Sequence, residues 1–153
     1  MEVIHKFINQ YKTQLIEIYN KETENVDEPY LLLINYTKSD RIIIFGPDGN
    51  HEPNEILQLI KKMDEGYDQV VISRFGKGSE NLDAGLIDGF GNKMFTFVAN
   101  IIFNGNMTDT LNESRSITRK AFEELKFDAM QLDSTFQMSI RGMKRKQRIV
   151  EIV

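Results

Sequence analysis

The stretch from Arg41 to Arg74 constrains the fold more than any other part of the chain. Two short apolar runs, without the polar alternation of a half-exposed strand, enclose a segment whose apolar residues recur at helical spacing. Pro53 stands where a first helical residue is expected, and Gly66 where a helix ends. The pattern therefore predicts a strand, a helix and a second strand joined as a βαβ unit, with the first strand buried on both faces. The expected inward-facing helix residues are Ile56, Leu57, Leu59, Ile60 and Met63.

The rest of the chain extends this unit into an α/β fold with a mixed, mostly parallel sheet and helices on both faces. Residues 2–22 form a predicted amphipathic helix, which packs on its own sheet or binds a partner. A helix over 84–104 is apolar on most sides, so we expect it to be buried in a core or an interface. Two shorter helices are predicted over 119–125, with Ala121, Phe122 and Leu125 inward, and over 133–143. The predicted strands cover residues 30–36, 41–45, 67–73, 114–118 and 147–152.

Length and composition limit the classes of protein to which the chain can belong. A chain of 153 residues predicts a single domain, with a helix and connector over 1–28 and an α/β core over 29–153. A net charge of −4 argues against a nucleic-acid partner. The absence of Cys excludes thiolate metal sites, and His5 and His51 lie too far apart in sequence to suggest a His-rich zinc site. No apolar run is long enough to span a membrane, so we expect a cytoplasmic protein.

Charged residues follow both strands of the Arg41–Arg74 stretch, at the sheet edge where ligands bind in open α/β folds. Asp48 lies on the turn after the first strand, and Arg74 ends the second. A carboxylate and a guanidinium at one edge suit a divalent cation and a phosphate. The alternative is that Asp48 shapes the turn and Arg74 caps the strand. Lys77, in the glycine-rich loop that follows, either meets a phosphate or belongs to a solvated loop.

Five short motifs in order resemble family-2 glycosyltransferases of the polyprenyl- or dolichyl-phosphate sugar transferase type. They are FGPDGNHEP from Phe45, EGYDQVVISR from Glu65, Gly91-Asn92 before an apolar helix, Thr108-Asp109-Thr110 followed by Arg115, and Ser139-Ile140-Arg141 with Ile149–Ile152. The resemblance covers residues 41–153 and implies the carboxyl half of a glycosyltransferase A-type fold. The N-terminal helix has no counterpart in it, and the strand-end motifs Pro-x-x-Asn-Glu and Asp-Asp-Gly-Ser of complete family members do not occur here.

The resemblance also implies roles for individual residues. Asp48 would hold Mg²⁺ or Mn²⁺ on the diphosphate of a nucleotide-sugar. Arg74 and Arg115 would bind phosphate or substrate. Lys77 is a further candidate, from its position beside two glycines and not from the resemblance. Asp133 or Asp109 would act as the base that deprotonates the acceptor.

Two functions remain open at this stage. The first is transfer of a sugar from a nucleotide-sugar to a lipid-phosphate or saccharide acceptor. The alternative is a shortened, non-catalytic relative that serves as a binding or assembly module. The resemblance implies peripheral membrane contact as a further interaction, and the basic run 144–148 is either a solvated helix end or a contact with anionic lipid. We also expect a homo-oligomer whose buried residues include Phe7, Tyr11, Leu15 and Phe97.

Overall fold

The computed structural model describes residues 34, 37–46, 52–78, 86–126 and 134–153. The chain divides into two compact units, Met1–Thr37 and Lys38–Val153. In the first unit only Ile34 and Thr37 are described. Of the predicted strand over 30–36, Ile34 is helical, so the strand prediction is wrong at that position. The fold described below is that of the second unit.

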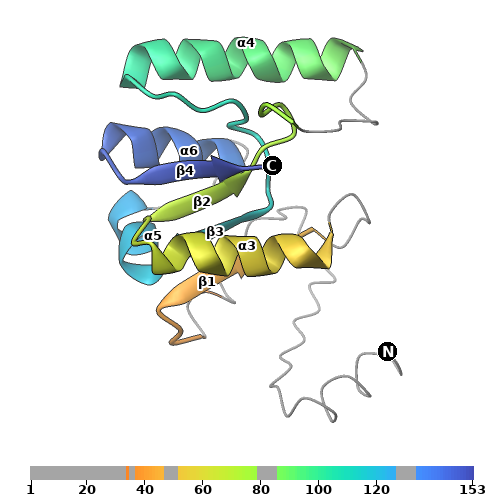
Figure 1. The fold of residues 1–153 in the computed structure, drawn as a ribbon. Coiled ribbons are helices and arrows are strands. Elements are labelled where there is room, and N and C mark those ends of the chain that lie inside the picture. Colours follow the sequence, from red (N-terminus) through yellow and green to blue (C-terminus); the bar gives the residue numbers. More distant parts are fainter. Residues whose placement is uncertain (1–33, 35–36, 47–51, 79–85, 127–133) are drawn as a thin grey trace, which may run out of the picture. The chain divides into compact units, whose positions relative to one another are not determined.

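A four-stranded sheet forms the centre of this unit, in the order β1-β3-β2-β4 (Figure 1). The strands are β1 (Arg41–Ile44), β2 (Gln69–Ile72), β3 (Arg115–Thr118) and β4 (Ile149–Ile152). β3 is antiparallel to β1 and to β2, whereas β2 and β4 are parallel. The prediction of a mixed sheet is confirmed, but the expectation that it is mostly parallel is wrong for these strands, because two of the three strand pairs are antiparallel. The two strands of the predicted βαβ unit do run the same way, but β3 lies between them.

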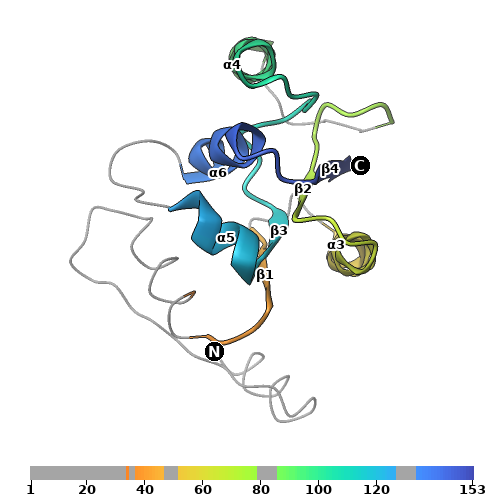
Figure 2. The same ribbon diagram turned by 90° about the vertical axis from the view of Figure 1, so that its left-hand side faces the viewer.

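Helix α3 (Pro53–Asp64) packs on one face of the sheet (Figure 2). Pro53 occupies its first turn, and Gly66 follows its end with a φ of 87°, a left-handed conformation that glycine adopts without strain. Its two buried residues are Leu59 and Met63. They pack in a core cluster with Val70 and Ile72 of β2 and with Ile152 of β4. The prediction that Leu57 and Ile60 also face inward is wrong, because they are 65% and 37% exposed.

The two strands of the predicted βαβ unit differ in burial. All four residues of β2 are buried. In β1 only Ile44 is buried, and Ile43 is 37% exposed. Among the described strands β1 stands at the end of the order, where fewer elements cover it. The prediction of a strand buried on both faces, which concerned residues 41–45, is therefore wrong for β1.

Helices α4 (Leu86–Phe103), α5 (Arg119–Leu125) and α6 (Ser134–Lys144) belong to the other side of the sheet (Figure 2). Residues from α4, β2 and α6 and from the turn after α4 share a second core cluster, made of Val71, Ala99, Met107 and Met143. In α5 the three predicted inward residues are all buried. Helices therefore cover both faces of the sheet, as the sequence predicts.

The turn between α4 and β3 approaches α6 closely. A Cβ added at Gly105 would lie 2.1 Å from the sulfur of Met143 and 2.9 Å from Oδ1 of Asn100. A larger residue at position 105 would therefore force the Met143 side chain to move. We expected α4 to be buried in a core or an interface, and within this chain the core covers only part of it. Ala99 is buried, but seven large apolar side chains of α4 are exposed.

Candidate functional site

The carboxyl ends of β2 and β4 meet the segment Thr108–Thr110, which precedes β3. The Glu151 carboxylate of β4 accepts hydrogen bonds from the backbone N–H groups of Thr108 and Asp109, at 2.8–2.9 Å, and from the Thr108 hydroxyl at 2.8 Å. The hydroxyls of Ser73, at the end of β2, and Thr108 lie 2.6 Å apart. The segment is thus fixed to the ends of two parallel strands.

Arg74 and Asp109, two of the predicted site residues, form an ion pair at this edge. Arg74 Nε donates to Asp109 Oδ2 at 2.8 Å, and Arg74 Nη2 donates to Oδ1 at 3.1 Å. The backbone N–H of Arg74 also reaches Oδ2, at 3.2 Å. The Asp109 side chain is fully buried, whereas that of Arg74 is 44% exposed. The pair therefore holds a half-exposed guanidinium in one orientation at the sheet edge.

Two further groups fix the Asp109 carboxylate. Asn92 Nδ2 of α4 donates to Oδ1 at 2.8 Å, and the backbone N–H of Leu111 donates to it at 3.2 Å. Burial raises the pKa of Asp109, but the hydrogen bonds from Arg74 and Asn92 and the positive charge of Arg74 outweigh it, and the net pKa lies below the usual range. A carboxylate with a lowered pKa and occupied oxygens is a weak proton acceptor.

Glu151 shows the opposite balance. Burial raises its pKa and exceeds the lowering effect of the hydrogen bonds from Asp109 and Thr108, and the nearby Asp109 charge raises the pKa further. Two carboxylates thus share this edge with their pKa values moved in opposite directions. This divergence is common at functional sites, although structural networks also produce it.

The Phe75 ring contacts two cations, Arg74 and Lys93. The Arg74 guanidinium carbon lies 5.5 Å from the centre of the Phe75 ring, and Lys93 Nζ of α4 lies 5.4 Å from it. Both distances suit a cation–π contact. The sequence analysis missed Lys93, because nothing in the chain's local pattern relates α4 to the loop after β2.

Of the other two predicted phosphate-binding residues, one is exposed and one is buried. Lys77 is exposed in the loop after Arg74. Arg115 is fully buried, and its guanidinium donates to Ser139 Oγ at 3.1 Å and to the carbonyl oxygen of Asn112. These contacts tie β3 to α6 inside the unit.

Asp48 and Asp133 lie outside the described residues. The chain leads toward Asp48 from Gly46, whose backbone N–H donates to Ser114 Oγ at 3.3 Å, so the end of β1 lies beside the start of β3. Within the described ranges no three His, Asp or Glu side chains converge as a metal site would require.

The model of glycosyl transferase family 2 matches residues 2–126, and the chain therefore belongs to that family. An uncharacterized protein of Methanocaldococcus jannaschii is 27% identical over 113 residues, which cover 69% of this chain and 46% of that protein. The chain thus spans less than half the length of this curated relative.

The extent of the family match corrects the sequence analysis. The match begins at residue 2, so the expectation that the N-terminal helix segment has no family counterpart is wrong. The match ends at residue 126, so the resemblances at Ser139–Arg141 and Ile149–Ile152 lie outside it. Of the helices formed by described residues, none is long and apolar enough to cross a membrane.

Proposed function

We propose that this chain takes part in the transfer of a sugar from a nucleotide-sugar to a lipid-phosphate or saccharide acceptor, at the carboxyl edge of its sheet. The observation that carries the proposal is the Arg74–Asp109 pair, which holds a half-exposed guanidinium at that edge in a chain of this family. Glycosyl transfer from a nucleotide-sugar releases a diphosphate. Fixed cations stabilise the negative charge that develops on such a leaving group.

Arg74 is the residue to which we assign phosphate binding. Its bidentate pair with Asp109 orients the guanidinium in advance, so that little side-chain freedom is lost when an anion binds. Lys93, on the same Phe75 ring, adds a second positive charge. Lys77, three residues further on, is the third cation of the proposal. Arg115 is buried, so our assignment of phosphate binding does not depend on it.

Asp109 is a positioning residue in this proposal and not the base. Its lowered pKa and its bonds to Arg74 and Asn92 suit an ion that remains charged. The role of base that deprotonates the acceptor therefore falls to Asp133. We retain Asp48 as the proposed ligand of Mg²⁺ or Mn²⁺. The described residues contain no cluster of three His, Asp or Glu side chains that could hold a metal ion.

The experiment is a transfer assay on the full chain. Radiolabelled UDP- and GDP-sugars are incubated with polyprenyl phosphate or with oligosaccharides, and labelled product is extracted. We expect product from at least one donor, and we expect Arg74→Gln to lower kcat/KM by about 100-fold or more, the usual cost of losing a charge-stabilising donor.

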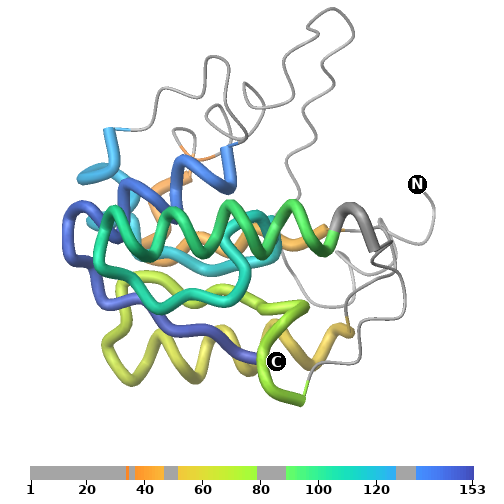
Figure 3. Tube along the Cα trace, turned by 90° about the horizontal axis from the view of Figure 1, so that it is seen from above, coloured from red at the N-terminus to blue at the C-terminus, as the bar shows by residue number. Residues whose placement is uncertain are grey.

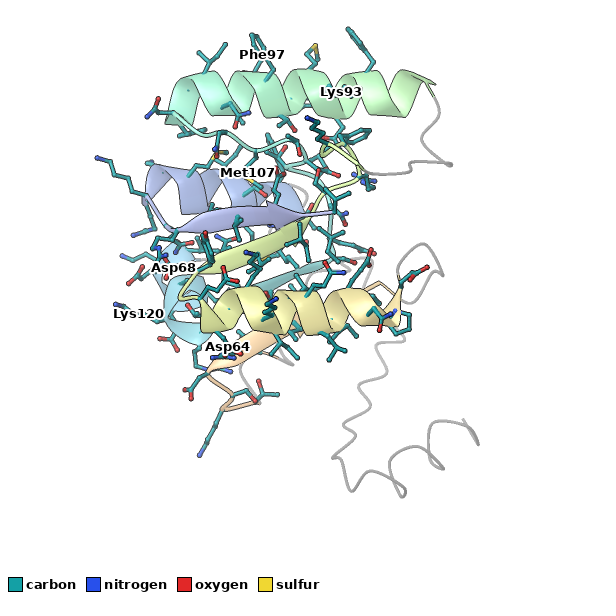
Figure 4. All side chains as sticks on the ribbon, viewed as in Figure 1. Asp64, Asp68, Lys93, Phe97, Met107 and Lys120 are labelled. Carbon is teal, nitrogen blue, oxygen red and sulfur yellow. The ribbon has the colours of Figure 1, made fainter. Side chains whose placement is uncertain are left out.

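Lys120→Gln is the matched control, because Lys120 is an exposed cation of α5 away from this edge (Figure 4). It should leave kcat/KM unchanged. A folded wild-type chain that neither transfers sugar nor binds any nucleotide-sugar by calorimetry would contradict the proposal. That result would favour a non-catalytic binding or assembly module.

A further inference from the structure

Helix α4 has its polar side turned inward. Asn92, Thr96 and Asn100 recur every four residues and therefore share one face. Asn92 bonds Asp109, Thr96 Oγ1 lies 2.9 Å from Thr110 Oγ1, and Asn100 bonds both backbone groups of Met107. These contacts hold the polar face of α4 against residues 107–110 and fix how the helix is rotated.

The opposite face of α4 is apolar and exposed. Seven large side chains are between 46% and 71% exposed; they are Phe90, Met94, Phe95, Phe97, Val98, Ile101 and Ile102. Figure 4 shows Phe97 pointing away from the sheet, while Met107 lies between α4 and the rest of the unit. α4 is also the element nearest the viewer in Figure 3, which looks down on this face. An ordinary surface helix has the reverse arrangement, with its apolar side inward.

The spacing and size of this apolar face suit a protein partner. Four of these side chains recur at intervals of four, three and four residues, which is the repeat that packs helix against helix. They are Phe90, Met94, Phe97 and Ile101. At about 200 Å² for a large apolar side chain, the seven exposed fractions amount to about 800 Å². Each partner in a standard stable interface contributes about the same area.

The charge pattern of α4 fits a lipid surface less well. Helices that lie on anionic membranes carry Lys and Arg beside their apolar face. From Gly89 to Phe103 the one charged residue is Lys93, and its ammonium group lies over Phe75. The last turn of α4 has no basic residue.

We propose that the exposed face of α4 is a homodimer interface that receives the same face of a second copy of this chain. Two copies related by a two-fold axis present identical surfaces to each other, so the apolar stripe of one α4 packs on that of the other. The proposal does not depend on the sugar-transfer function, because it uses the outer face of α4 and not the residues at the sheet edge.

The first test is the mass of the chain in solution. Light scattering at micromolar concentration should give twice the 17.8 kDa of one chain. Phe97→Glu with Ile101→Glu should raise the dissociation constant of the dimer by about 100-fold or more, because two central apolar contacts become buried charges. Leu57→Glu is the matched control. Leu57 is 65% exposed on α3 and Ile101 is 66% exposed on α4, so both positions accept a charge equally well in the monomer.

The second test locates the contact. The chain has no Cys, so Val98→Cys introduces a single thiol in the middle of the apolar face. Mild oxidation should yield a disulfide-linked dimer with Val98→Cys and little with Leu57→Cys. A monodisperse monomer at all concentrations would overturn the proposal. If that monomer also floats with vesicles of phosphatidylglycerol, the face belongs to lipid. A dimer that the Phe97→Glu/Ile101→Glu variant leaves intact would place the interface elsewhere and would equally overturn it.

Discussion

Asn100 and Met107 are joined by two hydrogen bonds between one side chain and one backbone. Asn100 Nδ2 donates to the Met107 carbonyl at 2.7 Å, and the Met107 N–H donates to Asn100 Oδ1 at 3.0 Å. The amide side chain thus satisfies both polar groups of a buried residue, as a neighbouring strand would. Through this contact the end of α4 determines where the chain turns toward Asp109 and the sheet edge.

Replacing Asn100 by Leu should destabilise the chain. The substitution removes both hydrogen bonds and leaves the N–H and carbonyl of Met107 without these partners beside a nearly buried side chain. We expect a loss of about 2–3 kcal/mol in the free energy of unfolding. Urea denaturation followed by circular dichroism measures it. Asn106→Ala, at an exposed position of the same turn, is the control and should change stability by less than about 0.5 kcal/mol. Equal midpoints for both variants would show that the double contact contributes nothing.

Thr118 joins β3 to α5 and caps the helix. Its side-chain oxygen accepts a hydrogen bond from the Ala121 N–H at 3.1 Å. Thr118→Val keeps the shape and removes the acceptor, so we expect a loss of about 1 kcal/mol. Thr118→Ser keeps the oxygen and should retain most of the stability. If Val and Ser lower the urea midpoint equally, the capping bond is not the source of the effect.

The elements that the sequence predicted best are those with local signals at their ends. Pro53 and Gly66 bound α3 within a residue or two, and the apolar spacing of α5 identified its three buried residues. The position of β3 between β1 and β2 had no local signal. A four-residue strand, Arg-Ser-Ile-Thr, owes its place to pairing with residues more than 40 positions away on either strand, and such pairing is decided by the tertiary structure.

The same limit applies to the candidate site. The sequence singled out Arg74 and Asp109 separately and gave them different roles, but no spacing relates two residues that are 35 positions apart. The orientation of α4 did have a signal that was missed. The regular spacing of Asn92, Thr96 and Asn100 indicates a polar face. Seven large apolar side chains occupy the opposite face, and this small unit does not bury them.

The Arg74–Asp109 pair predicts a pH dependence of stability. The pKa of Asp109 in the folded chain lies below its ordinary value of 3.8, so near that pH the unfolded chain binds the proton more readily. The stability that Asp109 contributes is therefore present above pH 3.8 and is lost as the pH falls through the folded pKa. Asn does not titrate, so the difference between wild type and Asp109→Asn should be about 2 kcal/mol at neutral pH and should shrink in acid.

Urea denaturation at a series of pH values measures this difference. The raised pKa of Glu151 has the opposite sign, since it adds stability as the pH falls. Its largest cause, burial, is common to both proteins, whereas the smaller part that comes from the Asp109 charge is lost in Asp109→Asn. Asp64→Asn is the control: Asp64 pairs with Arg41 at 2.7 Å, yet its side chain is 61% exposed, and surface pairs contribute less than about 1 kcal/mol. A wild-type advantage over Asp109→Asn that stays constant or grows as the pH falls below 3.8 would contradict the lowered pKa of Asp109 in the folded chain.

The proposed metal ligand is tested by binding and not by turnover. If Asp48 holds Mg²⁺ or Mn²⁺ on a diphosphate, Mn²⁺ together with UDP or GDP should raise the melting temperature, because a ligand that binds only the folded chain stabilises it by mass action. For a chain that spans less than half of its relative we expect a small rise, of about 1–3 °C. Asp48→Ala should abolish the rise, and Asp64→Ala should leave it unchanged. Arg74→Gln should reduce it with the diphosphate present and have no effect with Mn²⁺ alone. A rise that persists in Asp48→Ala would show that the cation is bound by other residues, and the assignment of Asp48 would then be wrong.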